Sequence, residues 1–240
     1  MDIQFLFDTF LELLGGVPLT LQLAISSVCA GFVLAMVLAL FCASGIPFLD
    51  WFARLYFFVF RGTPLLVQLF LIYYGLSQFE AIRSSFLWPI LREPYWCALI
   101  AFTMNTAAYA GSILYGGMLA VPYGQVEAAR VCGMKRTIIF RRIVLPLALR
   151  QALPAYGNEL ISMVKATSLA SIITLMEVTG TAARIVSESY RAIEVFVAAG
   201  VIYLMINFLL TRGIHMLEYQ FSPRVPAQNN SRNIAVGGQL

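Results

Sequence analysis

Four long runs without a charged residue constrain this chain more than any other feature. A helix that crosses the roughly 30 Å of bilayer hydrocarbon needs about 20 consecutive, mostly apolar residues. The chain is 60% hydrophobic and only 12% charged, whereas a soluble domain carries about 25% charged residues. It has too little polar surface to cover itself in water, so we expect a membrane protein. The charge-free runs lie between Glu12 and Asp50, Arg61 and Glu80, Glu93 and Glu127, and Glu194 and Arg212.

These runs predict an all-α membrane protein with about five transmembrane helices. A further apolar stretch at about 151–176 contains Glu159 and Lys165 and is counted as a span. Nothing resembles a linker between soluble domains, so residues 1–240 are expected to form a single transmembrane domain. We place its core at about 15–218 and a flexible cytoplasmic tail at 219–240. The spans are expected near 17–43, 62–79, 95–120, 147–176 and 195–216.

The start of the chain is unlike a cleavable leader, because it carries Asp2, Asp8 and Glu12 and no basic residue. We therefore expect the first span to remain in the mature protein.

The distribution of Lys and Arg predicts the orientation. If the N-terminus lies outside, eleven basic residues fall on the inner side, four on the outer side, and Lys165 within a span. Basic residues concentrate on the cytoplasmic side of membrane proteins, so the C-terminus is predicted to be cytoplasmic. The inner residues are Arg54, Arg61, Arg130, Lys135, Arg136, Arg141, Arg142, Arg150, Arg212, Arg224 and Arg232, and the outer ones are Arg83, Arg92, Arg184 and Arg191.

The second span is the least regular. Thr63-Pro64 is typical of a helix start, with Thr as the N-cap and Pro at the first helical position. The aromatic stretch before it, Phe48–Phe60, fits either an interfacial helix or a kinked extension of the span. The sequence leaves both open.

A basic loop joins the third and fourth predicted spans. Residues 125–132 can form a short helix that ends at Gly133, since glycine readily adopts the left-handed conformation found at helix ends. Glu127 lies in the first turns, where a negative charge complements the helix dipole. Ala128 and Ala129 have small side chains that would let another surface approach closely. Residues 134–142 are expected to form a basic amphipathic segment.

The residues of this loop resemble the E-A-A-x3-G-x9-I-x-L-P loop found in the permease subunits of bacterial ABC importers. An ordinary lipid-anchored loop would explain the arginines but not the seven matching residues over twenty positions. The resemblance implies a cytoplasmic coupling helix that binds an ATPase subunit. The matching residues are Glu127, Ala128, Ala129, Gly133, Ile143, Leu145 and Pro146.

Two further segments indicate which group of ABC importer permeases the chain resembles. Arg61–Leu69, which reads RGTPLLVQL, and Ala152–Glu159, which reads ALPAYGNE, are similar to permeases for polar amino-acid uptake. That group transports histidine with lysine, arginine and ornithine, or glutamine, or the opines octopine and nopaline. The chain is most similar to the histidine and opine branch, in which two related five-span permeases pair.

The resemblance implies several partners in the bacterial inner membrane. These are ATP-binding subunits, two in number, a homologous permease, a periplasmic solute-binding protein and membrane lipid; no nucleic acid is expected. Neither lysine of this chain belongs to a G-x4-G-K-[ST] phosphate-binding loop. We therefore expect no catalytic site and no cofactor in this chain, with ATP and Mg²⁺ used by a partner. The four cysteines lack zinc spacing and only His215 is available, so no metal site is expected.

Polar residues within the predicted spans are candidates for the substrate path, because such groups are costly in a membrane unless they face a cavity or a partner. A role in holding helices together remains open for all of them. Asn158, Ser162 and Lys165 fall on one helical stripe, whereas Glu159 and Lys165 are 120° apart around the helix. Glu159 facing a cavity would favour a cationic substrate. The candidates are Asn105, Thr106, Tyr109, Asn158, Glu159, Ser162 and Lys165.

Two other functions fit parts of the pattern. An ion-coupled secondary amino-acid transporter would use Glu159 as its coupling site, although no inverted repeat is evident. A membrane scaffold or sensor could recruit an ATPase without moving any solute.

Overall fold

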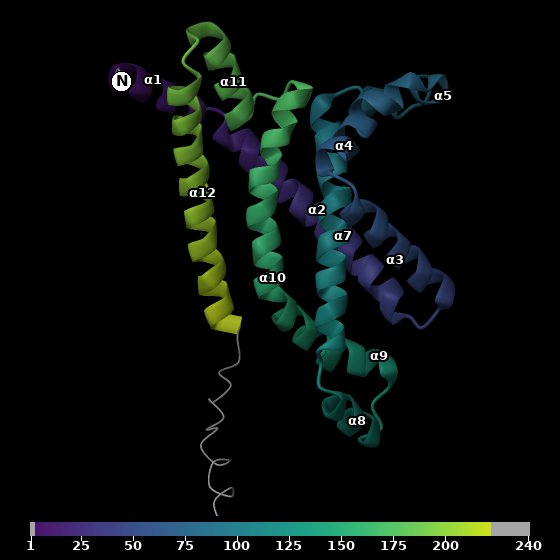
Figure 1. Cartoon of the computed structure of the whole chain (residues 1–240). Coiled ribbons are helices and arrows are strands. Elements are labelled where there is room, and N and C mark those ends of the chain that lie inside the picture. Colours follow the sequence, from purple (N-terminus) through teal and green to yellow (C-terminus); the bar gives the residue numbers. More distant parts are fainter. Residues whose placement is uncertain (1–2, 222–240) are drawn as a thin grey trace, which may run out of the picture.

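The described part of the chain, residues 3–221 of the computed structural model, is built from helices and contains no strand (Figure 1). Asp2 and residues 222–240, including Arg224, Arg232 and most of the predicted tail, lie outside the described part. The helices are α1 (Ile3–Leu14), α2 (Val17–Ala43), α3 (Pro47–Gly62), α4 (Leu65–Phe70), α5 (Glu80–Arg83), α6 (Trp88–Leu91), α7 (Pro94–Leu119), α8 (Tyr123–Val131), α9 (Arg136–Ile139), α10 (Leu145–Ala166), α11 (Val178–Ser189) and α12 (Ala192–Phe221). Shorter π and 3₁₀ turns are η1 (Leu71–Gly75), η2 (Leu76–Gln78), η3 (Phe140–Val144) and η4 (Thr167–Ile173).

The pair α2 and α7 forms the centre of the fold, with α10 packed against α7. Small residues line this centre because backbones of spanning helices approach closely only where side chains are small. A Cβ atom on Gly31 of α2 would lie 2.8 Å from Cγ2 of Thr106 on α7. The buried alanines that serve the same purpose are Ala24, Ala35, Ala39, Ala98, Ala101, Ala107, Ala108 and Ala110.

Three helical stretches are long and apolar enough to cross a membrane by themselves: Ile3–Ala43, Pro94–Leu119 and Ala192–Tyr219. Two bent pairs also qualify, and counting each pair as one span gives five. The all-α prediction is therefore confirmed for the described residues, with between three and five spans.

The second predicted span, 62–79, corresponds to the helical segment Leu65–Gln78. The aromatic stretch before it forms the separate helix α3, and the chain bends by 101° between the two. Thr63 and Pro64 have extended backbones at the bend, as expected because a residue before proline avoids the helical conformation. Thr63 is not the N-cap of the next helix. Its hydroxyl instead donates to the carbonyl of Val59 at 2.8 Å.

The fourth predicted span, 147–176, lies almost entirely within the helical stretch Arg136–Ile173, and the chain bends by 46° between that stretch and α11. Leu145 and Pro146 open α10, and α9 and η3 lead directly into it.

The N-terminal helix α1 was not predicted. It contacts α11 and α12, and its Glu12 accepts a hydrogen bond from Arg184 of α11 at 2.7 Å. The helices α8 and α9 lie at one end of the molecule, and α5 and α11 lie at the other (Figure 1).

Candidate functional site

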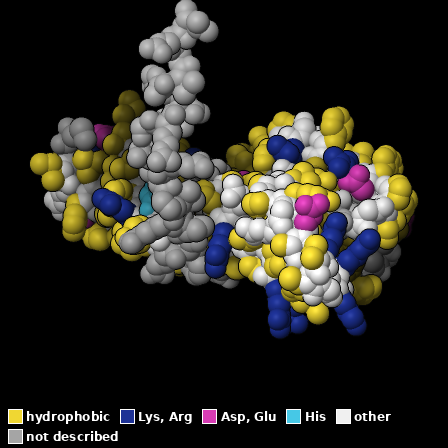
Figure 2. All heavy atoms as spheres, turned by 90° about the horizontal axis from the view of Figure 1, so that it is seen from below, with side chains coloured by type: hydrophobic (Ala, Val, Ile, Leu, Met, Phe, Trp, Pro, Cys, Tyr) yellow, Lys and Arg dark blue, Asp and Glu magenta, His cyan; other side chains and the backbone are white. Residues whose placement is uncertain are grey.

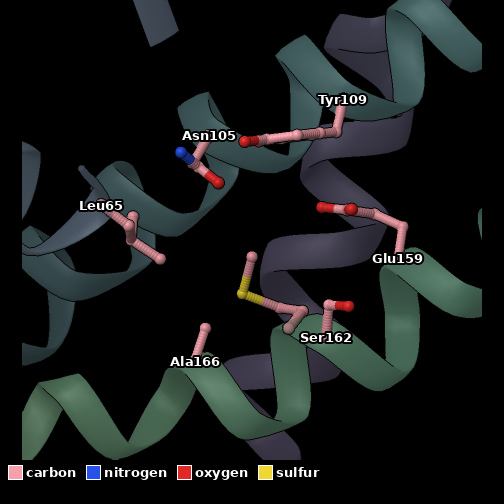
Figure 3. A pocket seen from close by; sticks show the side chains of 7 residues that line it. Leu65, Asn105, Tyr109, Glu159, Ser162 and Ala166 are labelled. Atoms are coloured by element: carbon pink, nitrogen blue, oxygen red, sulfur yellow. The ribbon is translucent and has the colours of Figure 1, made fainter. Parts of the chain in front are cut away.

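A polar pocket of about 280 Å³ lies where α4, α7 and α10 meet. This volume is close to the lower limit of roughly 300 Å³ for small-molecule sites. Figure 3 shows the carboxylate of Glu159, the hydroxyl of Tyr109 and the side-chain oxygen of Asn105 all pointing into it. Its lining residues are Leu65, Asn105, Tyr109, Glu159, Ser162, Met163 and Ala166.

Helical spacing explains which side chains reach the pocket. Asn105 and Tyr109 are one turn apart on α7, and Glu159, Ser162 and Ala166 recur at the three- and four-residue intervals of one face of α10. That face differs from the predicted stripe, of which only Ser162 lines the pocket. Asn158 and Lys165 are exposed on the surface of this chain.

The Glu159 carboxylate has few partners in the protein. The Thr106 hydroxyl faces it, yet the buried Thr106 oxygen does not reach ordinary hydrogen-bond geometry with any described group. Ion pairs among the described residues do not include Glu159. Thr106 itself is fully buried between helices and does not line the pocket. The pocket thus presents a carboxylate that a ligand can still bind.

Arg61 is a site residue that the sequence reasoning missed. It was counted as an inner-side charge, but its guanidinium carbon lies 5.3 Å above the ring centre of Tyr109, near the middle of α7. Nη1 of Arg61 also donates to the hydroxyl of Ser112 at 3.0 Å.

Arg61 lines a second, open cavity of about 340 Å³, which shares Tyr109 with the first pocket. It belongs to none of the ion pairs among the described residues. Tyr109 therefore lines both the pocket that contains Glu159 and the cavity that contains Arg61. The cavity is lined by Phe57, Phe58, Arg61, Gly62 and Tyr109.

The predicted docking loop forms a compact lobe of two short helical segments. α8 spans Tyr123–Val131, close to the predicted residues 125–132, and Glu127 lies in its second turn. Gly133 has φ +75°, and the amide of Met134 donates to the carbonyl of Ala129 at 3.1 Å. This left-handed glycine ends the helix as predicted.

The two alanines of the loop have different positions. Ala128 is exposed, as expected for a docking surface. Ala129 is only 5% exposed and faces the interior of the lobe. α8 contacts α9 and η3, and this folding of the lobe onto itself leaves one side of α8 available.

The outer surface of the lobe is basic and hollowed. Figure 2 shows Lys and Arg side chains gathered around the lobe built by α8 and α9. A cavity of about 430 Å³ on it is lined by Thr137, Ile138, Arg141 and Arg142. Glu127 and Pro146 are exposed, whereas Ile143 and Leu145 are half-buried where η3 joins α10.

A second buried carboxylate, Glu177, was also missed by the sequence reasoning. It is fully buried at the start of α11 and accepts hydrogen bonds from the amides of Thr179, at 2.9 Å, and Gly180, at 2.8 Å. The hydroxyl of Tyr203 on α12 donates to it at 2.7 Å. A side-chain acceptor at the residue before a helix is the signal that could have identified it.

Residues 13–221 match the family described as "Binding-protein-dependent transport system inner membrane component". The chain belongs to this family. It is accordingly an inner-membrane component of a binding-protein-dependent, ABC-type importer. This membership favours such import over the ion-coupled and scaffold alternatives.

Individual members of the family are similar over nearly their whole length. The octopine transport system permease protein OccM of Rhizobium radiobacter is 58% identical over 222 residues, covering 92% of this chain and 91% of that protein. The nopaline transport system permease protein NocM of Agrobacterium fabrum (strain C58) is 48% identical over 229 residues, 95% of each chain. A solved structure described as a crystal structure of an amino acid ABC transporter with histidines aligns with a TM-score of 0.82 and 31% identity, covering 92% of this chain and 99% of that one.

Proposed function

We propose that this chain is the permease subunit of an ABC importer for a cationic polar amino acid or an opine. The pocket that contains Glu159 carries the proposal, because its carboxylate and amide oxygens accept hydrogen bonds from an ammonium or guanidinium group. The similarity to proteins named for octopine and nopaline transport supports the same class. Octopine is an arginine derivative that keeps the guanidinium group and carries carboxylates.

Arg61 supplies the complementary charge for such a substrate. The guanidinium group of a protein arginine binds carboxylates well because its planar N–H groups match the carboxylate oxygens. A solute with a cation at one end and a carboxylate at the other would place its cation beside Glu159 and its carboxylate beside Arg61, with Tyr109 between them. Asn158 and Lys165 lie outside this pocket, on a surface that we assign to the homologous permease.

The test is uptake by the assembled transporter. The chain is purified with the proteins encoded beside it and reconstituted into vesicles with its solute-binding protein. ATP-dependent accumulation of labelled octopine or arginine, well above that of the neutral isostere citrulline, is expected. Equal accumulation of citrulline would contradict the cation assignment, and transport that needs a proton gradient but no ATP would contradict the importer assignment.

We further propose that the α8–α9 lobe faces the cytoplasm and binds one of the two ATP-binding subunits, with the N-terminus in the periplasm. The positive-inside count and the exposed, basic lobe support this orientation. ATP and Mg²⁺ would be bound by the partner, and closure of the ATPases would move the paired permeases as rigid bodies. The periplasmic end would receive the solute-binding protein.

Gly133 provides the test of this coupling. Its positive φ penalises any side chain by roughly 1 kcal/mol, whereas a Cβ atom there would meet nothing within 4 Å of this chain. Gly133→Ala is therefore expected to retain most transport, and Gly133→Arg to assemble poorly or to hydrolyse ATP without transport. The measurements are transport and ATP hydrolysis in the same vesicles. Wild-type transport by Gly133→Arg would count against the docking role.

A further inference from the structure

Gln68 lies in α4 just after the break in the second span and is only 6% exposed. Its Nε2 donates to the carbonyl oxygens of Phe60, at 2.8 Å, and Thr63, at 3.1 Å. It also donates to the Thr63 hydroxyl at 2.8 Å. Backbone carbonyl oxygens can only accept hydrogen bonds, so the nitrogen of Gln68 must face them. The oxygen of Gln68 is consequently turned toward α7.

The orientation of Gln68 determines the orientation of Asn105. Nδ2 of Asn105 donates to Oε1 of Gln68 at 3.2 Å and to the carbonyl oxygen of Phe60 at 3.4 Å. Reversing the Asn105 amide would bring its oxygen against two other acceptors, which is unfavourable in a buried site. The Asn105 oxygen therefore faces the pocket, as Figure 3 shows, and the nitrogen points away from it.

We propose that Gln68 is a positioning residue for substrate selection: by holding the Asn105 amide, it makes the pocket offer oxygen acceptors and selects a cationic, N–H-rich group over its neutral isostere. The inference rests on the proposed function, since it requires the substrate's cation to bind beside Glu159. Gln68 itself does not line the pocket. In the sequence, Gln68 stands out only as part of the RGTPLLVQL segment.

Arginine and citrulline are suitable probes because they have nearly the same shape but differ in charge and in one hydrogen-bonding group. Guanidinium presents donors only, whereas the ureido group of citrulline also carries an acceptor oxygen. If Gln68 no longer fixes the amide, the Asn105 nitrogen can turn into the pocket, where it repels guanidinium and donates to the ureido oxygen. Binding of both probes is measured on the assembled membrane complex without the solute-binding protein, which would impose its own selectivity.

The main variant is Gln68→Met, which keeps the volume and removes both the amide donor and the amide acceptor. We expect the preference for arginine over citrulline to fall about tenfold, the effect of one hydrogen bond to a charged group. Gln78→Met is the matched control, because Gln78 is an exposed glutamine outside the pocket. In an Asn105→Ala background, Gln68→Met should change the preference no further, since Gln68 acts through Asn105.

The outcomes separate the two proposals. A Gln68→Met complex that binds both probes as the wild type does, or that weakens both equally, would overturn the positioning role while leaving the cationic pocket intact. A wild-type complex with no preference for arginine would refute the cationic pocket itself. If Gln68→Met does not assemble, Gln68→Leu replaces it. The preference for arginine over citrulline is also measured for Asn105→Ala. An unchanged preference in that variant would also overturn the proposal.

Discussion

Glu159 and Glu177 are two carboxylates on one bent helical stretch, yet they differ in burial and in the hydrogen bonds that they accept. Glu177 is fully buried and accepts hydrogen bonds from two backbone amides and one tyrosine hydroxyl. Glu159 is half-buried, points into a cavity and receives no such set of donors. The difference lies in the helix geometry. Glu177 stands at the start of α11, where backbone amides are free, and Glu159 lies inside α10, where they are already bonded.

This comparison separates a structural carboxylate from one that is available to a ligand. A buried charge is tolerated only if hydrogen bonds or a partner compensate the loss of water. The protein compensates Glu177 internally, and a cationic substrate would compensate Glu159. Burial alone would favour Glu177 as the functional residue, because it is the more buried of the two. Its hydrogen bonds within the protein identify it instead as the structural one.

The largest effect is expected for Glu177→Ala. The variant leaves the amides of Thr179 and Gly180 and the Tyr203 hydroxyl without their acceptor, and we expect a loss of about 3 kcal/mol or more in stability. The bend before α11 should loosen, and the thermal stability of the purified complex should fall strongly. Glu188→Ala, at an exposed position near the end of the same helix, is the control. Wild-type stability of Glu177→Ala would remove the distinction between the two carboxylates.

Glu159→Gln is expected to act on binding rather than on stability. The substitution removes a charge that no described ion pair uses, so the thermal stability of the complex should stay the same or rise slightly. Affinity for arginine should fall about tenfold to a hundredfold, since a charge-assisted hydrogen bond becomes a neutral one. Citrulline binding should change little. Unchanged affinity and selectivity in an assembled complex would remove Glu159 from the substrate path.

The smallest effects come from a pair of hydroxyl deletions. Tyr203→Phe removes one donor to Glu177 and should cost about 1 kcal/mol of stability without changing substrate preference. Tyr109→Phe removes a hydroxyl that points into the pocket and should lower arginine affinity by a few-fold with normal stability. Both are measured by thermal unfolding and by binding on the same preparations. If Tyr109→Phe lowered stability and left arginine affinity unchanged, Tyr109 would have a structural role and not a role in binding.

Much of the architecture follows from the sequence. Charge-free runs predict spanning helices because charge is excluded from hydrocarbon, and three of the predicted spans agree closely with α2, α7 and α12. Gly133 marks the end of α8 because few other residues adopt a positive φ cheaply. These signals are local, so no long-range contact is needed to read them.

The break between α3 and α4 shows where local signals end. Thr63-Pro64 indicates a helix boundary, but not a 101° bend, because the direction of the second arm is set by its contacts with α7. The same contacts bring Arg61 against Tyr109 and Gln68 against Asn105, pairs that are separated by more than thirty positions. No periodicity within one helix could indicate them.

The sequence by itself determined the membrane location, the helices, the basic loop between the third and fourth spans and the residue types available for a polar site. The tertiary structure decided which of those residues meet. The predicted stripe of Asn158, Ser162 and Lys165 gave way to Glu159, Ser162 and Ala166, because the rotation of α10 is fixed by burying Gly157, Met163 and Val164. Helical spacing shows which side chains share a face, and only packing against the neighbouring helices decides which face lines the pocket.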